Sequence, residues 1–485
     1  MKRTALAFAL LATGCTAVGP NYHRPAVAVP DRYQEASSAA PIGDNDLAAW
    51  WRGFGDPQLT ALVDLAVAQN LDVQAAAARI REARAMERVA GAAASPQLDA
   101  QASASRQRIS ENAIPVPPGS GSGGRAGAGS FGLPGSEFST FRIGFDASWE
   151  IDLFGRTRRS VEAASARTGA AIWNRRDVQV SIAAEVASAY FRLRTAQAGI
   201  ANANDELARQ RRLERLLAAQ QRGGLTSGQE VSGQSSARAA AAAAIPGLEA
   251  QAKAEIHALG VLTGTTPETL TSLARASAIP SVPDIPAGLP SDLLRRRPDV
   301  RAAERELAAA TADIGVAVAD LYPRISLTAA PALVSTALAS LLTWGSHSYS
   351  AGAALDWQLF DGGRRRANVE AKNAKAEQAT IAYRKTVLGA LQDVEDALAR
   401  IDADRAQLAV RQEAVRAAAR AEDLSRTRYR GGLVTLADVL GQQARRLSME
   451  NQAVESKGAL ARDTAALAKA LGGGWPELAQ AGATQ

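Results

Sequence analysis

Two stretches of the chain alternate between apolar and polar residues. From position 141 to 151 the odd positions carry Phe, Ile, Phe, Ala, Trp and Ile, and from 349 to 359 they carry Tyr, Ala, Ala, Leu, Trp and Leu. A period of two predicts β-strands with one apolar and one polar face. We expect strands at about 141–152 and 348–360, preceded by shorter partners at about 97–106 and 324–330.

Other stretches place apolar residues at alternating steps of four and three. One such series begins at Ile182 and continues through Val186, Ala189 and Leu193, and another begins at Val387. This spacing of 3.5 predicts helices packed by knobs into holes. We expect long helices at 156–220, 228–263, 364–428 and 436–470. The first of them would be on the order of 95 Å long at about 1.5 Å per residue.

The chain repeats itself at constant offsets. Adding 208 to a position takes Trp149 to Trp357 and Gly155 to Gly363, and adding 227 takes Pro96 to Pro323. Each copy is read as helix, strand, strand, very long helix and helix. The predicted organisation is a signal peptide at 1–14, an N-terminal segment at 15–58, a first repeat at 59–264, a proline-rich linker at 265–290, a second repeat at 291–472 and a tail at 473–485.

The only cysteine, Cys15, follows a short apolar run that begins with Lys2 and Arg3. This pattern is typical of a secretory signal. The four residues that end at Cys15 resemble the lipobox of bacterial lipoproteins, so we expect Cys15 to carry diacylglycerol, and Thr16 implies sorting to the outer membrane. Behind Cys15 no apolar run of about 18 residues follows, so the sequence predicts no transmembrane helix.

Composition excludes several classes of function. The net charge of +6 is too dilute over 485 residues for nucleic-acid binding. Three histidines, His23, His257 and His347, lie far apart, and neither a cysteine pair nor a phosphate-binding loop is present. We therefore expect no enzyme, no metal and no cofactor.

Four long motifs resemble the TolC-like outer-membrane efflux factors, and in particular the NodT-type lipoproteins of tripartite pumps. They are "CTAVGPNYHRP" at 15–25, "LLRRRPDVRAAERELAAATADIGVAVADLYPRISLT" at 293–328, "RYRGGLVTLADVL" at 428–440 and "ALGGGW" at 470–475. Four strands cannot close a barrel in one chain, so an oligomer is required. The resemblance selects a homotrimer, mainly α-helical, with a 12-stranded membrane β-barrel and a long α-helical periplasmic tunnel.

The resemblance implies a passive exit duct in the outer membrane. Solutes such as drugs, solvents or metal ions would arrive from an inner-membrane transporter of the resistance-nodulation-division class, through a periplasmic adaptor protein; an ATP-driven exporter is the alternative transporter. An alternative function is a coiled-coil structural lipoprotein without a pore, and an alternative reading of the strands is a soluble sandwich. Neither the exported substrates nor the particular pump follows from the sequence.

Three groups of residues are candidates for function. Polar residues of the second strand are candidates for the barrel lumen. The glycine pairs end the long helices and, by the resemblance, contact the adaptor, while a tyrosine and two acidic residues close the periplasmic end. The lumen candidates are Arg142, Asp146, Glu150 and Asp152; the adaptor-contact turns are Arg222, Gly223, Gly224, Leu225, Arg430, Gly431, Gly432 and Leu433; and the gate candidates are Tyr429, Asp438 and Glu230. For Asp438, a carboxylate that merely stabilises a helix N-terminus is an equal alternative.

Overall fold

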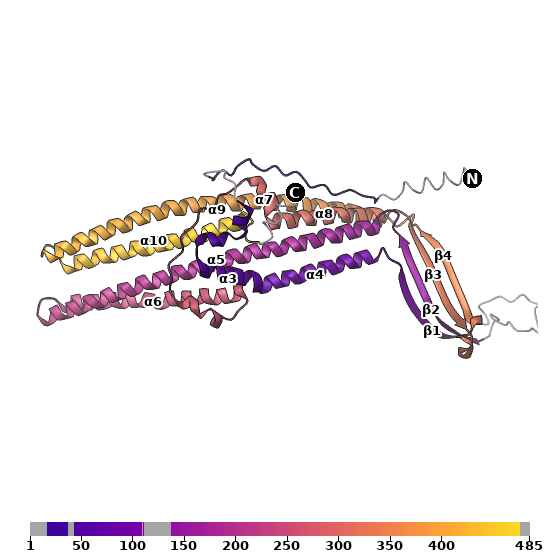
Figure 1. Ribbon diagram of the computed structural model, residues 1–485, viewed down its shortest axis with the longest axis horizontal. Coiled ribbons are helices and arrows are strands. Elements are labelled where there is room, and N and C mark those ends of the chain that lie inside the picture. Colours follow the sequence, from indigo (N-terminus) through magenta and orange to yellow (C-terminus); the bar gives the residue numbers. More distant parts are fainter. Residues whose placement is uncertain (1–16, 37–42, 109, 111–136, 476–485) are drawn as a thin grey trace, which may run out of the picture. The chain divides into compact units, whose positions relative to one another are not determined.

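The computed structural model describes residues 17–36, 43–108, 110 and 137–475 (Figure 1). Cys15 and the glycine-rich loop at 115–136 lie outside the described residues. The chain divides into two compact units, which are described separately. The sheet unit consists of Met1–His23, Arg84–Ala166 and Ala308–Gln378, and the helical unit consists of Arg24–Ala83, Arg167–Leu307 and Ala379–Gln485. Each unit therefore draws segments from both sequence repeats.

Four antiparallel strands form the sheet, in the order β1-β2-β3-β4 (Figure 1). Their bounds are β1 Gln97–Arg108, β2 Glu137–Ile151, β3 Arg324–Ser335 and β4 His347–Asp356. β3 continues beyond the expected 330 because Ala332 and Leu333 pair with strands on both sides. β4 ends before the expected 360, since pairing with β3 stops at Asp356 opposite Arg324.

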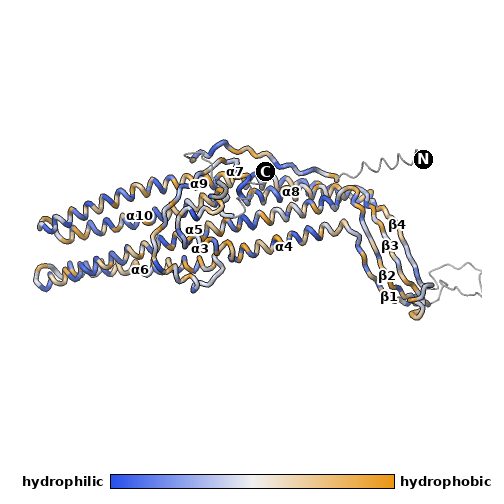
Figure 2. Tube along the Cα trace, viewed as in Figure 1, coloured by the Kyte–Doolittle hydropathy of each residue, from blue (hydrophilic) through white to orange (hydrophobic). Residues whose placement is uncertain are grey.

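The register brings the apolar positions of all four strands to one face. Ile143 lies between Ala102 of β1 and Leu333 of β3. Trp149 faces Leu327, which in turn faces Ala353. Because side chains alternate along a strand, the intervening positions form a second, polar face. Hydrophobic and hydrophilic positions alternate along the strands in Figure 2.

The four long helices form two hairpins. The first pairs α5 (Arg156–Arg222) with α6 (Gly228–Thr263), and the second pairs α9 (Arg364–Arg430) with α10 (Leu436–Ala470) (Figure 1). α5 and α9 each run two residues past the expected ends at 220 and 428. In both helices the chain turns only at the following glycine pair, where Gly224 and Gly432 have φ of 72° and 71°.

The helix expected before the first strand of each repeat is present as α4 and α8, and shorter elements fill segments for which the sequence predicted no helix. The N-terminal segment contains α2 and η1, the first repeat begins within α3, and the proline-rich linker contains η2. Their bounds are α2 Asp44–Ala48, η1 Trp50–Phe54, α3 Pro57–Gln69, α4 Leu71–Ala92, η2 Pro267–Ala274, α7 Pro290–Arg296, α8 Pro298–Ala319, η3 Leu338–Ser340 and η4 Trp344–Ser346.

The core of the helical unit is built where η1 and α3 pack on α5. Phe54 contacts Phe191 with ring centroids 4.8 Å apart. The hydroxyl of Tyr190 donates to Asp56 over 2.6 Å. Arg194 is fully buried, and its guanidinium donates to side chains of Gln58 and Gln197. Both terminal nitrogens of the guanidinium are paired inside the core, which lowers the cost of burying this charge, whereas its Nε has no hydrogen-bond partner.

The apolar stripe of α9 differs in detail from the sequence expectation. The buried positions include Val387, Val394 and Ile401, as expected, but alanines at 390 and 397 lie between them. Leu391 and Leu398, which the spacing placed in the stripe, are half-buried. Among the described residues, no helix combines enough length with enough apolar character to span a membrane.

Candidate functional site

Three of the charged lumen candidates lie on β2 and the fourth, Asp152, directly follows it, and all four are paired with opposite charges. Arg142 lies 3.8 Å from Asp146. Beyond them, Glu150 binds Arg156 over 3.1 Å, and Asp152 contacts Arg158 over 3.4 Å. Each of the four candidates therefore has a counter-charge within the sheet unit. This arrangement provides a polar surface without an excess of one sign.

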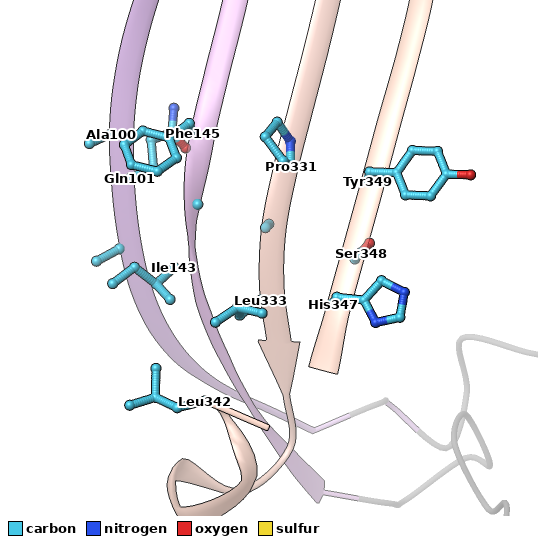
Figure 3. A pocket seen from close by; sticks show the side chains of 13 residues that line it. Ala100, Gln101, Ile143, Phe145, Pro331, Leu333, Leu342, His347, Ser348 and Tyr349 are labelled. Atoms are coloured by element: carbon cyan, nitrogen blue, oxygen red, sulfur yellow. The ribbon is translucent and has the colours of Figure 1, made fainter. Parts of the chain in front are cut away.

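The other face of the sheet carries an open hollow of 670 Å³. Ile143, Phe145, Leu333 and Tyr349 line it from three strands, and Leu342 lines it from the β3–β4 connection (Figure 3). Phe145 and Tyr349 are 50% and 80% exposed. An apolar face of this extent, left uncovered in a single chain, marks a surface for lipid or another protein.

Two tryptophans fix the ends of the strands in the same way. The indole of Trp149 donates to the carbonyl of Ala94 over 2.9 Å, and that of Trp357 donates to the carbonyl of Leu321 over 3.1 Å. The donors differ by 208 positions and the acceptors by 227. These are the two offsets found in the sequence, so both repeats make the same contact.

An N-terminal contact was missed by the sequence reasoning. Arg159, which is 4% exposed, donates to the carbonyls of Val18 and Gly19 and to the side chain of Asn21. The amide of Val18 also donates to Phe154 over 3.0 Å. No local pattern singles out Arg159, because its partners lie about 140 positions away in the sequence.

The first hairpin tip is a closed glycine turn. The amide of Gly224 donates to Gln221, and the amide of Leu225 reaches back to Gln220 over 2.9 Å. This pair of bonds is the Schellman motif, in which the glycine adopts a positive φ. The apolar residue that follows usually packs against the helix it terminates. Here Leu225 is 79% exposed instead.

The second tip repeats the first. Gly432 donates to Tyr429, and Leu433 donates to Arg428 over 2.9 Å. Leu433 is 77% exposed, nearly the same as its counterpart in the first tip. The structure therefore provides two equivalent tips, each with a leucine that is largely exposed.

The acidic gate candidates cap the helices that leave the tips. The carboxylate of Glu230 accepts a hydrogen bond from the backbone amide of Ser227. In return, the hydroxyl oxygen of Ser227 accepts one from the backbone amide of Glu230. Asp438 and Thr435 form the same capping box in the second tip. Side-chain and backbone hydrogen bonds from Thr435 lower the pKa of Asp438, and those from Thr226 and Ser227 lower the pKa of Glu230.

Tyr429 lies near the second tip but not in the capping box. Its side chain is 38% exposed, and within the described residues no hydrogen bond joins it to Asp438. The structure thus gives both carboxylates the local role of a helix cap. That role accounts for their positions without excluding a second function.

Ion pairs link the two helices of each hairpin behind the tips. Glu214 binds Arg238 over 2.9 Å in the first hairpin, and Glu422 binds Arg446 over 3.3 Å in the second. Each member of the second pair lies 208 positions after its counterpart. Glu422 is only 4% exposed and also accepts from Gln443 over 3.1 Å.

The chain is similar to known proteins over nearly its whole length. A family model described as outer membrane efflux protein matches residues 62–265 and 289–473. The chain is 33% identical to the pyoverdine export outer membrane protein OpmQ of Pseudomonas aeruginosa, over 98% of this chain and 97% of that protein. It is 31% identical to nodulation protein T of Rhizobium leguminosarum bv. viciae, over 98% of this chain and 94% of that protein.

A solved structure agrees with these matches. The outer-membrane channel OprN superposes with a TM-score of 0.84 at 32% identity, and the match covers 94% of this chain and 99% of that one. The similarity thus includes both the sheet and the helices described above.

Proposed function

This chain belongs to the outer membrane efflux protein family, and on that premise we propose how it works as the exit duct of a tripartite efflux pump. In this proposal three copies join their sheets into one 12-stranded barrel across the outer membrane. Their helices continue the passage into the periplasm as an α-helical tunnel. The duct is passive, and solutes are delivered by an inner-membrane transporter through a periplasmic adaptor.

The open sheet is the observation that carries the barrel proposal. β1 and β4 form its two edges, and every residue of both strands is exposed in the single chain. Unpaired edges favour pairing with another chain. Edge-to-edge joining of three sheets removes all free edges and leaves a barrel wide enough for water. The continuous apolar face then meets lipid, while Arg142, Asp146, Glu150 and Asp152 face the lumen.

Disulfide crosslinking tests this arrangement. Each test variant carries one cysteine in β1, at Ala100, Ala102 or Ala104, and one in β4, at Ala351 or Ala353. The control variant carries its cysteine at Ala329 in the central strand β3. We expect edge pairs to yield covalent species up to a trimer and the control to yield none. The trimer should also conduct ions across a planar bilayer. Absence of crosslinks from every edge pair, or a ladder beyond three chains, would contradict the proposal.

The lipid anchor is proposed to hold the start of the chain beside the barrel. Cys15 lies two residues before Ala17, and Val18 and Gly19 are bonded to Phe154 and Arg159 at the junction of β2 and α5. An acylated cysteine so close to the strand ends can reach the inner leaflet of the outer membrane, where the acyl chains and the barrel anchor the protein together.

Substitution of the cysteine tests this anchor. Cys15→Ala should reduce targeting or assembly and leave the circular dichroism spectrum unchanged; an unfolded variant would contradict the proposal.

The tips are proposed to bind the adaptor, and the same end is proposed to hold the gate. Three chains present six equivalent tips, each formed by Arg222–Leu225 or its counterpart Arg430–Leu433, which suits a six-fold ring of adaptor hairpins. The transporter behind it is of the resistance-nodulation-division class, with an ATP-driven exporter as the alternative. Tyr429, Asp438 and Glu230 would then narrow the passage.

A structural lipoprotein without a pore is disfavoured, because it gives the amphipathic sheet no function.

A further inference from the structure

The connection between β3 and β4 turns its polar groups inward. The hydroxyl of Ser346 donates to the carbonyl of Ser340 over 2.6 Å, and Thr343 donates to the same carbonyl over 2.7 Å. The hydroxyls of Ser335 and Ser340 lie 2.7 Å apart, and Ser335 also donates to Ala337. The hydroxyls of Ser335, Ser340, Thr343 and Ser346 therefore find partners within the connection, as polar groups must where water is scarce, whereas Thr336 is exposed.

The apolar side chains of the same connection point outward. Leu338, Leu342 and Trp344 are 67%, 80% and 85% exposed. The ring of Trp344 is supported on one side by His347, with centroids 4.8 Å apart. A connection that ends in water normally exposes its hydroxyls and buries its large apolar groups. The arrangement here is the reverse.

Charge distribution separates this end of the sheet into two parts. From Ile325 to Leu355 the sequence has no Asp, Glu, Lys or Arg. The neighbouring end of the β1–β2 pair carries Arg106 and Glu137, which form a 2.8 Å ion pair and are 72% and 46% exposed. The β3–β4 connection is thus uncharged and apolar, whereas the ends of β1 and β2 are suited to water.

The exposed leucines continue the apolar face of the sheet. Leu342 lines the same hollow as Ile143, Leu333 and Tyr349 (Figure 3). The connection therefore extends the surface that the barrel proposal assigns to lipid. Trp is the side chain enriched where hydrocarbon meets the polar boundary of a bilayer.

We propose that the β3–β4 connection is a membrane-interface anchor, with Leu338, Leu342 and Trp344 inserted among lipid acyl chains. This proposal rests on the proposed barrel. β2 and β4 lead into α5 and α9 at one end of the sheet, and the anchor would lie in the membrane leaflet at the opposite end. Three copies per trimer would fix the depth of the barrel in the membrane from that side. A neighbouring copy is the rival occupant of this surface.

Fluorescence quenching tests the anchor directly. The full chain is reconstituted in phosphatidylcholine vesicles that contain lipid brominated on its acyl chains, and the signal of Trp344 is taken as the difference between wild type and Trp344→Phe. Trp149, measured in the same way with Trp149→Phe, reports on the apolar face of the sheet itself. We expect both signals to be quenched by the brominated lipid and Trp344 to be shielded from aqueous acrylamide.

The outcomes separate the anchor from the barrel. Quenching of Trp149 by lipid together with quenching of Trp344 by acrylamide alone would overturn the anchor and leave the barrel intact. A Trp344 signal that neither agent reaches would also overturn it, and would favour contact with a neighbouring copy. If brominated lipid quenches neither tryptophan, the barrel proposal fails together with the anchor.

A charge substitution provides a second, independent test. Leu342→Lys is compared with Leu225→Lys, since the two leucines are almost equally exposed but only the first is assigned to lipid. We expect Leu342→Lys to reduce the vesicle-inserted fraction by roughly threefold or more, because a charged lysine among acyl chains on the lipid face of a barrel is disfavoured. Leu225→Lys should leave that fraction unchanged. Equal effects of the two variants, or none from Leu342→Lys, would contradict the anchor.

Discussion

At the scale of single residues, a carboxyl pair distinguishes the second hairpin from the first. Arg192 binds Glu255 over 2.8 Å in the first hairpin, and the equivalent Arg400 lies 3.6 Å from Asp463 in the second. Asp404, whose counterpart 208 positions earlier is the buried Ala196, adds another carboxyl there. Burial, a hydrogen bond with Asp463 and the charge of Asp463 raise the pKa of Asp404 to about 6, against the opposing charges of Arg462 and Arg400.

The raised pKa predicts a pH-dependent stability. Between pH of about 4 and 6 the folded chain retains a proton on Asp404 that the unfolded chain releases, so stability falls as pH rises through this window and stays low above it. After a discount for solvent screening, we expect Asp404→Asn to stabilise the protein by about 1 kcal/mol above pH 7 and much less near pH 4. Thermal unfolding across pH measures this, with Asp402→Asn as the control. An equal gain at both pH values would contradict it.

Asp438 tests whether a helix cap also acts in the gate. Asp438→Ala and Thr435→Ala both remove the capping box, but only the first removes a charge. We expect both variants to unfold at lower temperature, and the loss from Asp438→Ala to disappear at acidic pH, because its pKa is lowered in the fold and the cap needs the carboxylate. A gate role predicts that only Asp438→Ala changes the closed-state current in planar bilayers. Equal currents in both variants would leave Asp438 as a cap alone.

At the scale of elements, the hairpin tips are determined by one conformational requirement. Gly224 and Gly432 have positive φ, while Gly223 precedes the turn with an ordinary helical backbone and space for a Cβ atom. L-residues other than glycine are disfavoured at positive φ. The glycine pair in each tip therefore contains one glycine that is required by conformation and one that is not.

Substitution within one pair measures that requirement. Gly224→Ala should cost about 1 kcal/mol in unfolding free energy, since the alanine must adopt a left-handed conformation. Gly223→Ala should be neutral or stabilising, because it extends a helix. Denaturant unfolding of the two variants provides the comparison. Equal losses would indicate that the tip is held by packing of both glycines and not by φ.

The exposed leucines of the tips predict where the adaptor binds. A photoreactive residue at Leu225 or Leu433 should crosslink to the adaptor in cells, because both leucines are largely exposed at the tips. Leu338, equally apolar but in the β3–β4 connection, is the control and should yield no adaptor crosslink. Crosslinks from Leu338 with none from the tips would contradict the proposed docking.

At the scale of the whole molecule, charge is balanced where solutes would pass. The lumen candidates Arg142, Asp146, Glu150 and Asp152 each have a counter-charge. A wide, water-filled passage of mixed charge discriminates poorly between solutes. We therefore expect selectivity to belong to the inner-membrane transporter, so that the cargo of this chain is the cargo of its pump.

Susceptibility profiling tests that division of labour. Deletion of the gene for this protein should sensitise cells to the same compounds as deletion of its transporter, because a passive duct adds no preference of its own. The measurement is growth inhibition by antibiotics, dyes, solvents and metal ions in both strains. A profile that is wider for the duct would indicate that several pumps share it, and two unrelated profiles would contradict a dedicated duct.

Features that depend on residues close along the chain could be predicted from the sequence alone. Alternation predicted β2 and β4, although β4 ends earlier than expected, and steps of four and three predicted the long helices. The glycine turns are equally local, and so are the capping boxes that join Ser227 to Glu230 and Thr435 to Asp438. The sequence predicts gate residue and helix cap as equal alternatives for Asp438 and a gate role for Glu230, and the gate role stays a prediction. Membership of the efflux family followed from long motifs, and the comparisons confirmed it.

Contacts between residues far apart in the sequence became visible only in the folded chain. Arg159 and Val18, 141 positions apart, and Asp404 and Asp463 on separate helices have no common pattern in the sequence. The register of β2 against β3 and the inward hydroxyls of the β3–β4 connection were likewise absent from the sequence reading. The physical reason is that the spacing of apolar residues specifies which side of a helix or strand is apolar. Which other element covers that side depends on how the whole chain packs.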